Sequence, residues 1–284
     1  MQIYPALEQA LMCSDPVQKC GLVNSIVAAV DKGQALFDVG LALPYEVPVA
    51  GQPTRPLLVP PQSVARRKLS SREGHAAMVH ALCHIEFNAI NLGLDAAWRF
   101  RLLPPAFLQD WLRVASEEAK HFMALKQRLQ KLGFDYGDFD AHNHLWAMAD
   151  KTAYDPLVRM ALVPRVLEAR GLDVTPGIQA KLTSIGDAET VAILDMIYAE
   201  EKDHVAIGNR WFAHLCQQRG LDPLSVFKGL LKRYDVFVFR GYFNVSARTE
   251  AGFSAFELSM LQDFQEGHDA LARLSAKGTP IKKV

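Results

Sequence analysis

The chain contains Glu118-Ala119-Lys120-His121 and Glu201-Lys202-Asp203-His204, two copies of the pattern Glu-x-x-His. In an α-helix, residues three positions apart lie on the same face. Each copy therefore predicts a helix that directs a carboxylate and an imidazole toward one point. Two such helices can hold a pair of metal ions when neighbouring helices supply further carboxylates.

Two more glutamates precede these strings at nearly equal distances. Glu86 lies 32 residues before Glu118, and Glu168 lies 33 residues before Glu201. This agreement predicts two helical hairpins, each of which contributes one Glu and one Glu-x-x-His. A single Glu-x-x-His would be an ordinary solvated helix face, but the repeated spacing favours a metal site.

Length and composition limit the class of protein. The chain has 284 residues, half of them apolar, and a formal net charge of zero. This is enough to bury a large core. A chain without net positive charge is not expected to bind nucleic acid or an anionic membrane in a general way. The short basic cluster at 66–68 is interpreted as the solvated start of a helix.

The cysteines and the apolar runs predict a cytoplasmic setting. The four cysteines form no Cys-x-x-Cys pair, which argues against a zinc ribbon and a dense disulfide framework. The first residues lack the pattern of a signal peptide. No run approaches the ~18 uncharged apolar residues of a membrane span. We expect a cytoplasmic protein without a membrane-spanning helix.

Apolar residues that recur at steps of three and four predict the main helices. They fall at 6–12, 17–38, 72–101, 105–132, 155–171 and 187–218. Pro164 predicts a kink or a break inside the fifth of these helices, and Gly171 predicts its end. The proline-rich stretch 40–64 predicts an extended arm, with disorder as the alternative. The apolar run 57–59 favours an arm that packs.

These elements predict an all-α fold in three parts. Residues 1–71 form N-terminal helices and a proline-rich arm packed on the bundle. Residues 72–218 form a four-helix bundle that holds the metal site. Residues 219–284 form an aromatic-rich helical extension with a turn around 244–252. The aromatic side chains of this extension either pack against the bundle or form a lid or wall over a substrate pocket.

The decisive point is that four acids lie on helix stripes that are otherwise largely apolar. A carboxylate in a core is costly unless it is paired, and four together repel one another. Two cations remove both problems, and ligands of the carboxylate and imidazole types suit iron or manganese. The predicted metal ligands are Glu86, Glu118, His121, Glu168, Glu201 and His204.

Residues next to these ligands are candidates for supporting roles. Glu117 and Glu200 each lie four residues before a ligand histidine, so they either hydrogen-bond its imidazole or are solvated. Tyr198 lies one turn before Glu201; it donates to a ligand carboxylate, acts in redox chemistry, or packs in the core. Five further residues are left out of the site: His80, Cys83, His84, His142 and His144.

At these positions the chain resembles the ferritin-like di-iron carboxylate superfamily, over roughly 72–218. The strings 116–121 and 199–204 carry the resemblance, together with Glu86 and Glu168. The strings 80–86, 168–173, 242–244 and 251–253 are similar to a bacterial family catalogued as a domain of unknown function. A more distant likeness is to the tRNA-modifying di-iron hydroxylases, through the same ligand layout.

The resemblance implies a ferritin-like four-helix bundle with two iron ions and dioxygen as co-substrate. It implies an oxidoreductase that oxidises or hydroxylates a small organic substrate and needs an electron donor. Manganese or a mixed Mn/Fe pair remains open. The alternative is a non-catalytic or ferroxidase-type metal-handling protein, and a purely structural bundle is a third reading. We expect a monomer or homodimer, because the segments flanking the bundle would cover surfaces that a storage cage needs.

Overall fold

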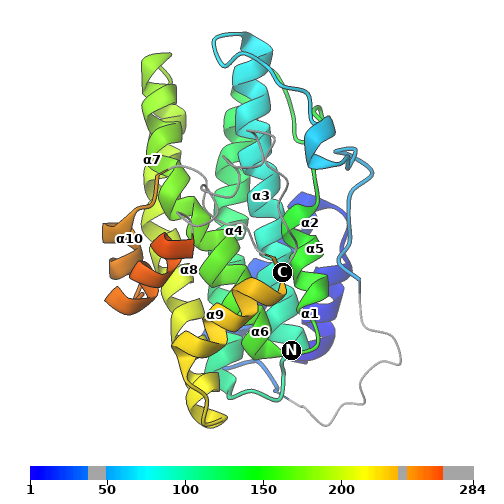
Figure 1. Cartoon of the computed structure of the whole chain (residues 1–284). Coiled ribbons are helices and arrows are strands. Elements are labelled where there is room, and N and C mark those ends of the chain that lie inside the picture. The colour runs from blue at the N-terminus through cyan, green and yellow to red at the C-terminus, as the bar shows by residue number, and fades with distance from the viewer. Residues whose placement is uncertain (38–48, 236–241, 265–284) are drawn as a thin grey trace. The chain divides into compact units, whose positions relative to one another are not determined.

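The computed structural model describes residues 1–37, 49–235 and 242–264, and in these ranges the regular structure is helical. Isolated β-bridges join Gln2 to Leu36 and Leu58 to Ala141. The chain divides into two compact units, and Figure 1 labels the helices of both. Unit 1 consists of Met1–Pro156 with Lys181–Ile197, and unit 2 consists of Leu157–Ala180 with Tyr198–Val284. Among the described helices, none combines the length and hydropathy needed to cross a bilayer.

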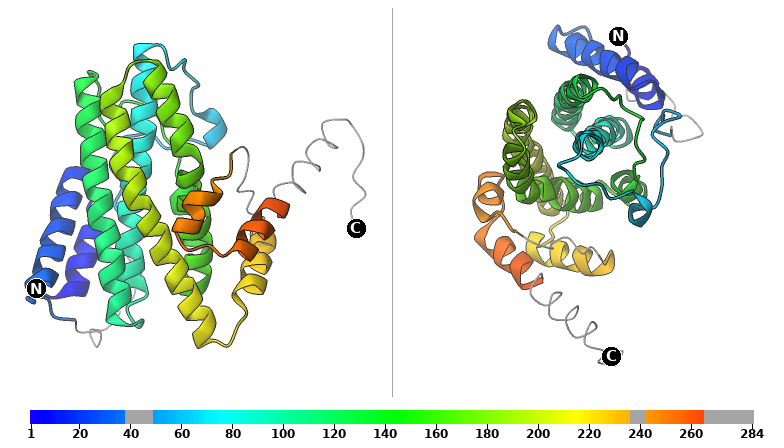
Figure 2. Two further views of the ribbon diagram at one scale, coloured as in Figure 1. Left: turned by 90° about the vertical axis from the view of Figure 1, so that its left-hand side faces the viewer. Right: turned by 90° about the horizontal axis from the view of Figure 1, so that it is seen from above.

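Unit 1 is built around two long helices, α3 (Arg72–Arg99) and α4 (Pro105–Lys131). The short connection 100–104 makes them a hairpin, as the sequence predicts. Ser71 caps α3 by accepting a hydrogen bond from the Gly74 amide, and Pro105 occupies the first turn of α4. The helices α1 (Ile3–Met12) and α2 (Pro16–Asp31) pack against this pair (Figure 2). The short helix α5 (His144–Lys151) follows α4.

The predicted helix 17–38 is too long, because α2 ends at Asp31. Gly33 takes a left-handed conformation with φ of 65° and stops the helix. The amides of Gly33 and Gln34 then bond back to the carbonyls of Val30 and Ala29. Position 38 lies outside the described residues.

The arm packs on unit 1, but by a different contact from the one predicted. The Val59 amide donates to the Ala141 carbonyl at 2.8 Å, and the Ala141 amide donates to the Leu57 carbonyl at 3.0 Å. The side chains of Leu57 and Leu58 remain 63% and 39% exposed. Backbone hydrogen bonds, together with the buried side chains of Ala50 and Pro56 rather than these leucines, therefore hold the described part of the arm. Residues 40–48 of the predicted arm lie outside the described ranges.

Unit 2 contains a helical run whose winding changes along its length. It begins as α6 (Pro156–Leu162), continues as the π-helical segment η2 (Val163–Glu168), and returns to α-helix in α7 (Ala169–Ser184). The break or kink predicted at Pro164 is thus a π-helical segment, since proline has no amide to donate to the α-helical ladder. The predicted end at Gly171 is wrong. The helix continues because Leu172 and Asp173, directly after it, are buried.

The rest of the chain adds one long helix and several short ones. The long helix α8 (Ala188–Gln218) directly follows Asp187, whose carboxylate accepts from the Thr190 amide. The helices α9 (Pro223–Arg233) and α10 (Val245–Glu250) follow, and residues 255–264 are also helical. The turn predicted at 244–252 is therefore the short helix α10, capped by the Asn244 side chain and closed by Gly252 with φ of 91°.

Candidate metal centre

Unit 1 brings Glu86, Glu118 and His121 together. Glu86 comes from α3, while Glu118 and His121 come from one face of α4. The three residues are 4%, 1% and 0% exposed. His121 Nδ1 lies 3.2 Å from Glu118 Oε2 and 3.6 Å from Glu86 Oε2. Because each residue offers a ligand atom within 4.8 Å of the others, the triad has the dimensions of a metal-binding group.

A close crossing of α3 and α4 makes this approach possible. Gly93 lies two turns after Glu86, and a Cβ atom there would be 2.9 Å from the Ala115 Cβ and 3.0 Å from the Trp111 carbonyl oxygen. Ala115 in turn lies one turn before Glu118. Only a glycine at position 93 lets the two helix backbones come this close without displacement, so it sets the separation of the ligands.

Burial and charge favour the protonated forms of Glu86 and His121 when no metal ion is bound. Burial, with a further contribution from the neighbouring carboxylate of Glu118, raises the pKa of Glu86 to about 8. Burial alone would lower the pKa of His121, but its hydrogen bonds to Glu118 and Glu86 raise that pKa. A cation would replace these protons and neutralise the two acids, so metal binding at this triad would release protons.

An apolar and aromatic layer surrounds the first triad. Phe87 and Phe122, the neighbours of Glu86 and His121 in sequence, are fully buried and pack with ring centroids 5.9 Å apart. The Tyr136 ring meets Phe122 edge to face at 5.1 Å. These rings keep water from the carboxylates, which strengthens any interaction of the carboxylates with a cation.

The nearby histidines have other partners. His84 Nδ1 lies 2.8 Å from the Tyr136 hydroxyl, and its Nε2 lies 3.0 Å from the Asn88 amide nitrogen. His80 Nε2 accepts from the Gly137 amide at 3.0 Å. Burial lowers the pKa of both imidazoles to about 4. They are neutral groups that attach the 134–142 segment to α3.

Unit 2 carries the other three predicted ligands, two of them on α8 and one at the end of η2. Glu201 and His204 lie on one face of α8, with His204 Nδ1 3.8 Å from Glu201 Oε2. His204 is fully buried, and the Glu201 side chain is 14% exposed. Glu168 is the last residue of η2 and is half-buried. Each unit thus supplies one Glu and one Glu-x-x-His, as the sequence repeat predicts.

A second glycine contact lies beside this triad. A Cβ atom at Gly208 would be 2.4 Å from the Pro164 Cβ, so α8 crosses η2 at van der Waals contact. Gly208 lies two turns after Glu201, and Pro164 lies one turn before Glu168. Gly93 likewise lies two turns after Glu86, and its contact Ala115 lies one turn before Glu118. A glycine seven residues after a predicted ligand is the sequence signal that marks both crossings.

The candidate supporting residues occupy different settings. The Tyr198 hydroxyl accepts a hydrogen bond from the Asn244 side-chain amide at 2.9 Å, and the same amide donates to the Leu172 carbonyl at 3.2 Å. Tyr198 therefore helps to hold the C-terminal extension on α7 and α8. Glu117 and Glu200 are half-buried. Their proposed hydrogen bonds to the ligand imidazoles stay predictions.

Sequence reasoning missed a group of buried arginines in unit 2. Arg165 lies three residues before Glu168 and is 1% exposed, with its guanidinium carbon 4.1 Å and 4.0 Å from the ring centroids of Phe212 and Phe227. It donates to Asn209 and forms an ion pair with Glu257. The available signal was the presence of two arginines, Arg159 and Arg165, inside the otherwise apolar run 157–166.

Comparisons with known proteins identify relatives but no reaction. The model of the family described as Protein of unknown function (DUF455) matches residues 12–259. An uncharacterized protein of Haemophilus influenzae is 46% identical over 275 residues, which cover 93% of this chain and 95% of the relative. No solved structure matches the chain.

Proposed function

We propose, for a chain that belongs to the DUF455 family, that the two triads together hold a dinuclear metal centre. Glu86, Glu118 and His121 would serve one ion, and the second triad, Glu168, Glu201 and His204, would serve the other. Two iron ions are the pair that we favour, with manganese or a mixed pair as variants. The helices α3, α4 and α8 and the run 156–184 would then form a ferritin-like bundle.

The observation that carries this proposal is the burial of the first triad. Two carboxylates and one imidazole lie within 4.8 Å of one another, and none is more than 4% exposed. A folded protein gains nothing in stability from two acids in one apolar place, because burial and mutual repulsion oppose their charge. A cation held by both acids supplies the missing charge. The matching residues of unit 2 extend the proposal to two ions.

The chemistry that we propose is dioxygen-dependent oxidation. Two bound ferrous ions would supply the reduction of dioxygen and the oxidation or hydroxylation of a small organic substrate, with electrons from an external donor. The residues of the chain would hold the two ions and keep the ligand side chains in position. The glutamates fix the ions, the apolar rings beside Glu86 and His121 exclude water, and the close helix crossings keep the ligands in place.

Metal analysis tests the metal centre. Protein purified anaerobically and loaded with Fe²⁺ is expected to retain two ions per chain by inductively coupled plasma mass spectrometry. Glu118→Gln and Glu201→Gln should each lose at least one ion, because each removes a charged ligand. Asp203→Asn is the matched control: Asp203 is exposed and adjacent to His204, so this variant should keep both ions. Two ions retained in both glutamine variants would refute the assignment.

Oxygen consumption separates the enzyme from the metal-handling alternative. With a chemical reductant and a panel of apolar organic compounds, an oxidase or monooxygenase consumes dioxygen repeatedly and forms oxidised product. A ferroxidase-type protein consumes dioxygen only in proportion to the Fe²⁺ supplied. Consumption that stops at that proportion with every compound would favour metal handling.

A further inference from the structure

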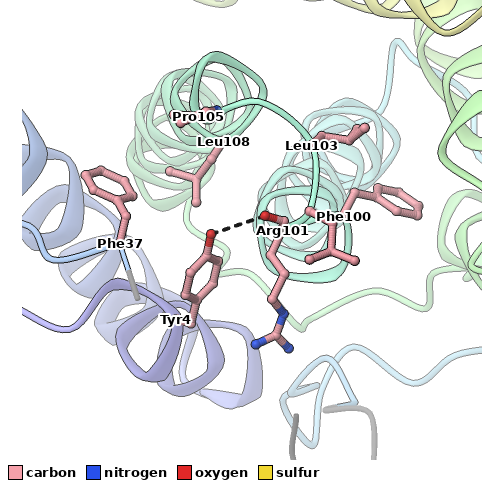
Figure 3. A pocket seen from close by; sticks show the side chains of 8 residues that line it. Tyr4, Phe37, Phe100, Arg101, Leu103, Pro105 and Leu108 are labelled. Carbon is pink, nitrogen blue, oxygen red and sulfur yellow. Dashed lines mark hydrogen bonds between the residues drawn. The ribbon is translucent and has the colours of Figure 1, made fainter. Parts of the chain in front are cut away.

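A pocket in unit 1 lies where α3 ends and the chain turns into α4. It has a volume of about 280 Å³ and is bordered by the start of α1, the connection 100–104 and the start of α4 (Figure 3). Phe100, the residue that follows α3, lies 14 residues after Glu86, which corresponds to roughly 20 Å along a helix. The pocket is therefore distinct from the first triad.

The walls of this pocket are mainly apolar. Four of the lining side chains are those of Phe37, Phe100, Leu103 and Leu108. Leu102, which also lines the pocket, is 89% exposed, whereas Leu108 is 4% exposed. The pocket thus extends from an open mouth to a buried wall. An apolar pocket that contains only a few polar groups has the character of a small-molecule site.

Two polar atoms face each other in this apolar setting. The Tyr4 hydroxyl donates to the Arg101 carbonyl oxygen at 3.5 Å, and Figure 3 shows this pair among the lining side chains. A hydrogen bond between two oxygen atoms is ordinarily about 2.5–3.0 Å long. The bond between Tyr4 and Arg101 is therefore weak, and it leaves a donor and an acceptor that a third group can use.

The Arg101 side chain supports this pair from outside the pocket. Its guanidinium points away from the pocket, and the guanidinium carbon lies 4.3 Å from the Trp98 ring centroid and 5.1 Å from the Tyr4 ring centroid. The Leu103 amide donates to the Phe100 carbonyl at 2.9 Å and closes a turn around Arg101. Burial raises the pKa of Tyr4 more than the charge of Arg101 lowers it, so the hydroxyl keeps its proton.

We propose that this pocket binds a small apolar molecule that carries one hydroxyl group, such as an alkylphenol. The ligand hydroxyl accepts from the Tyr4 hydroxyl and donates to the Arg101 carbonyl. It replaces one long hydrogen bond by two of ordinary length, because two oxygens 3.5 Å apart leave room for a third at about 2.8 Å from each. The apolar part of the ligand lies against Phe37, Phe100 and Leu108.

A neutral ligand suits this pocket better than an anion. Arg101 is the one cationic residue among the described residues that line it, and the charge of Arg101 points elsewhere. An anion would therefore lose its hydration without meeting a positive charge, which is costly. A hydroxyl group needs only one donor and one acceptor, and the pocket offers both.

Isothermal titration calorimetry of the full, metal-free chain with 4-propylphenol tests the proposal. Two analogues separate the parts of the contact: 4-propylanisole cannot donate to the carbonyl, and propylbenzene forms neither hydrogen bond. The unmodified chain is expected to bind 4-propylanisole roughly five- to tenfold more weakly than 4-propylphenol, because the carbonyl loses its donor. Tyr4→Phe should weaken the binding of 4-propylphenol by a similar factor and leave that of propylbenzene within about twofold.

Two further variants place the site. Leu108→Trp should abolish the binding of 4-propylphenol by filling the pocket. Tyr154→Phe is the matched control, because Tyr154 is an exposed tyrosine of unit 1 whose hydroxyl lies outside the pocket, and affinity should be unchanged. Circular dichroism confirms that each variant folds. If Leu108→Trp does not fold, Tyr4→Phe and the comparison with 4-propylanisole decide the question.

Three results would overturn the proposal. They are the absence of binding at millimolar 4-propylphenol, an affinity of Tyr4→Phe for 4-propylphenol equal to that of the unmodified chain, and unchanged binding by a folded Leu108→Trp variant. Because the titrations use metal-free protein, their outcome is separate from that of the metal centre.

Discussion

Arg248 on α10 donates from Nε and Nη2 to the two carboxylate oxygens of Asp173 on α7, and both side chains are fully buried. The backbone amide of Asn244 donates to the same carboxylate at 2.9 Å. These bonds join residues about 75 positions apart and hold the C-terminal extension to the helix that follows Glu168. The strings 168–173 and 242–244, which carry the family resemblance, therefore contribute a structural pair in addition to a predicted ligand.

Breaking this pair should destabilise the protein strongly. Arg248→Met leaves the Asp173 carboxylate buried without its main cation, and we expect the free energy of unfolding to fall by about 3–5 kcal/mol. Chemical denaturation followed by circular dichroism measures this change in unfolding free energy. The double variant with Asp173→Asn should recover part of the loss, because the buried charge is then gone. Lys228→Met, at an exposed position of α9, should change little; an equal loss there would contradict the explanation.

The crossing at Gly208 should not tolerate a methyl group. In Gly208→Ala the new Cβ meets the Pro164 ring, which cannot turn away, and we expect a loss of about 1–3 kcal/mol in unfolding free energy. Retained metal should also fall, because Glu201 and Glu168 lie on the two segments that are forced apart. Gly229→Ala on α9 is the matched control. Nothing lies within 4 Å of its Cβ position, so the helix should gain roughly 0.5–1 kcal/mol.

The buried imidazole of His80 predicts a loss of stability in acid. Its pKa is about 4 in the folded chain, because burial lowers it more than the charges of Asp138 and Asp140 raise it, against about 6.5 for an unfolded chain. The unfolded chain therefore binds the proton first. Stability is complete above pH 6.5 and declines as the pH falls toward 4, by up to about 3 kcal/mol.

His80→Gln tests this decline. The glutamine oxygen can accept from the Gly137 amide as His80 Nε2 does, but it does not titrate. Urea denaturation at pH 4.5, 5.5 and 7 should show a shallower fall in unfolding free energy for the variant. Part of the fall should remain, because burial lowers the pKa of His84 as well. A pH dependence identical to that of the unmodified chain would rule out His80 as its source.

Removing one acid from the first triad should separate stability from metal binding. Burial, the larger cause, still raises the pKa of Glu86 in Glu118→Gln, but this pKa should fall because the neighbouring charge that also raises it is gone. The metal-free variant should therefore melt no lower than the metal-free parent. The parent should gain roughly 2.7 kcal/mol at a metal concentration 100-fold above the dissociation constant, and the variant should not. Differential scanning calorimetry with and without Mn²⁺ compares them, and a metal-induced shift kept by the variant would count against the ligand role of Glu118.

The sequence predicted the parts of the fold that depend on local pattern. The hairpin of α3 and α4, the start of α8 and the meeting of Glu86 with Glu118 and His121 follow from helical periodicity and the Glu-x-x-His spacing. The errors lie where tertiary contacts outweigh local preference. Gly171 does not end its helix because the buried residues after it hold the backbone. Backbone hydrogen bonds attach the segment 57–59, and its leucines stay exposed, which apolar content alone did not predict.

Part of the candidate site was beyond reach from the sequence. The Arg248–Asp173 pair joins distant segments, and no periodic pattern pairs an arginine with a particular aspartate. The Asn244–Tyr198 bond has the same origin. The partner of Gly208 at its crossing, Pro164, lies 44 residues earlier, and local pattern does not pair the two positions.

The π-helical winding of η2 has a consequence for the direction of Glu168. An α-helix turns about 100° per residue, and a π-helical turn holds roughly one residue more. Side chains after η2 are therefore rotated relative to the phase that α6 establishes. Glu168 ends η2, so its direction follows this change of winding rather than the phase of the buried face of α6. Deleting a single residue from 163–167 would restore the α-helical phase and turn this carboxylate about a quarter of a revolution away.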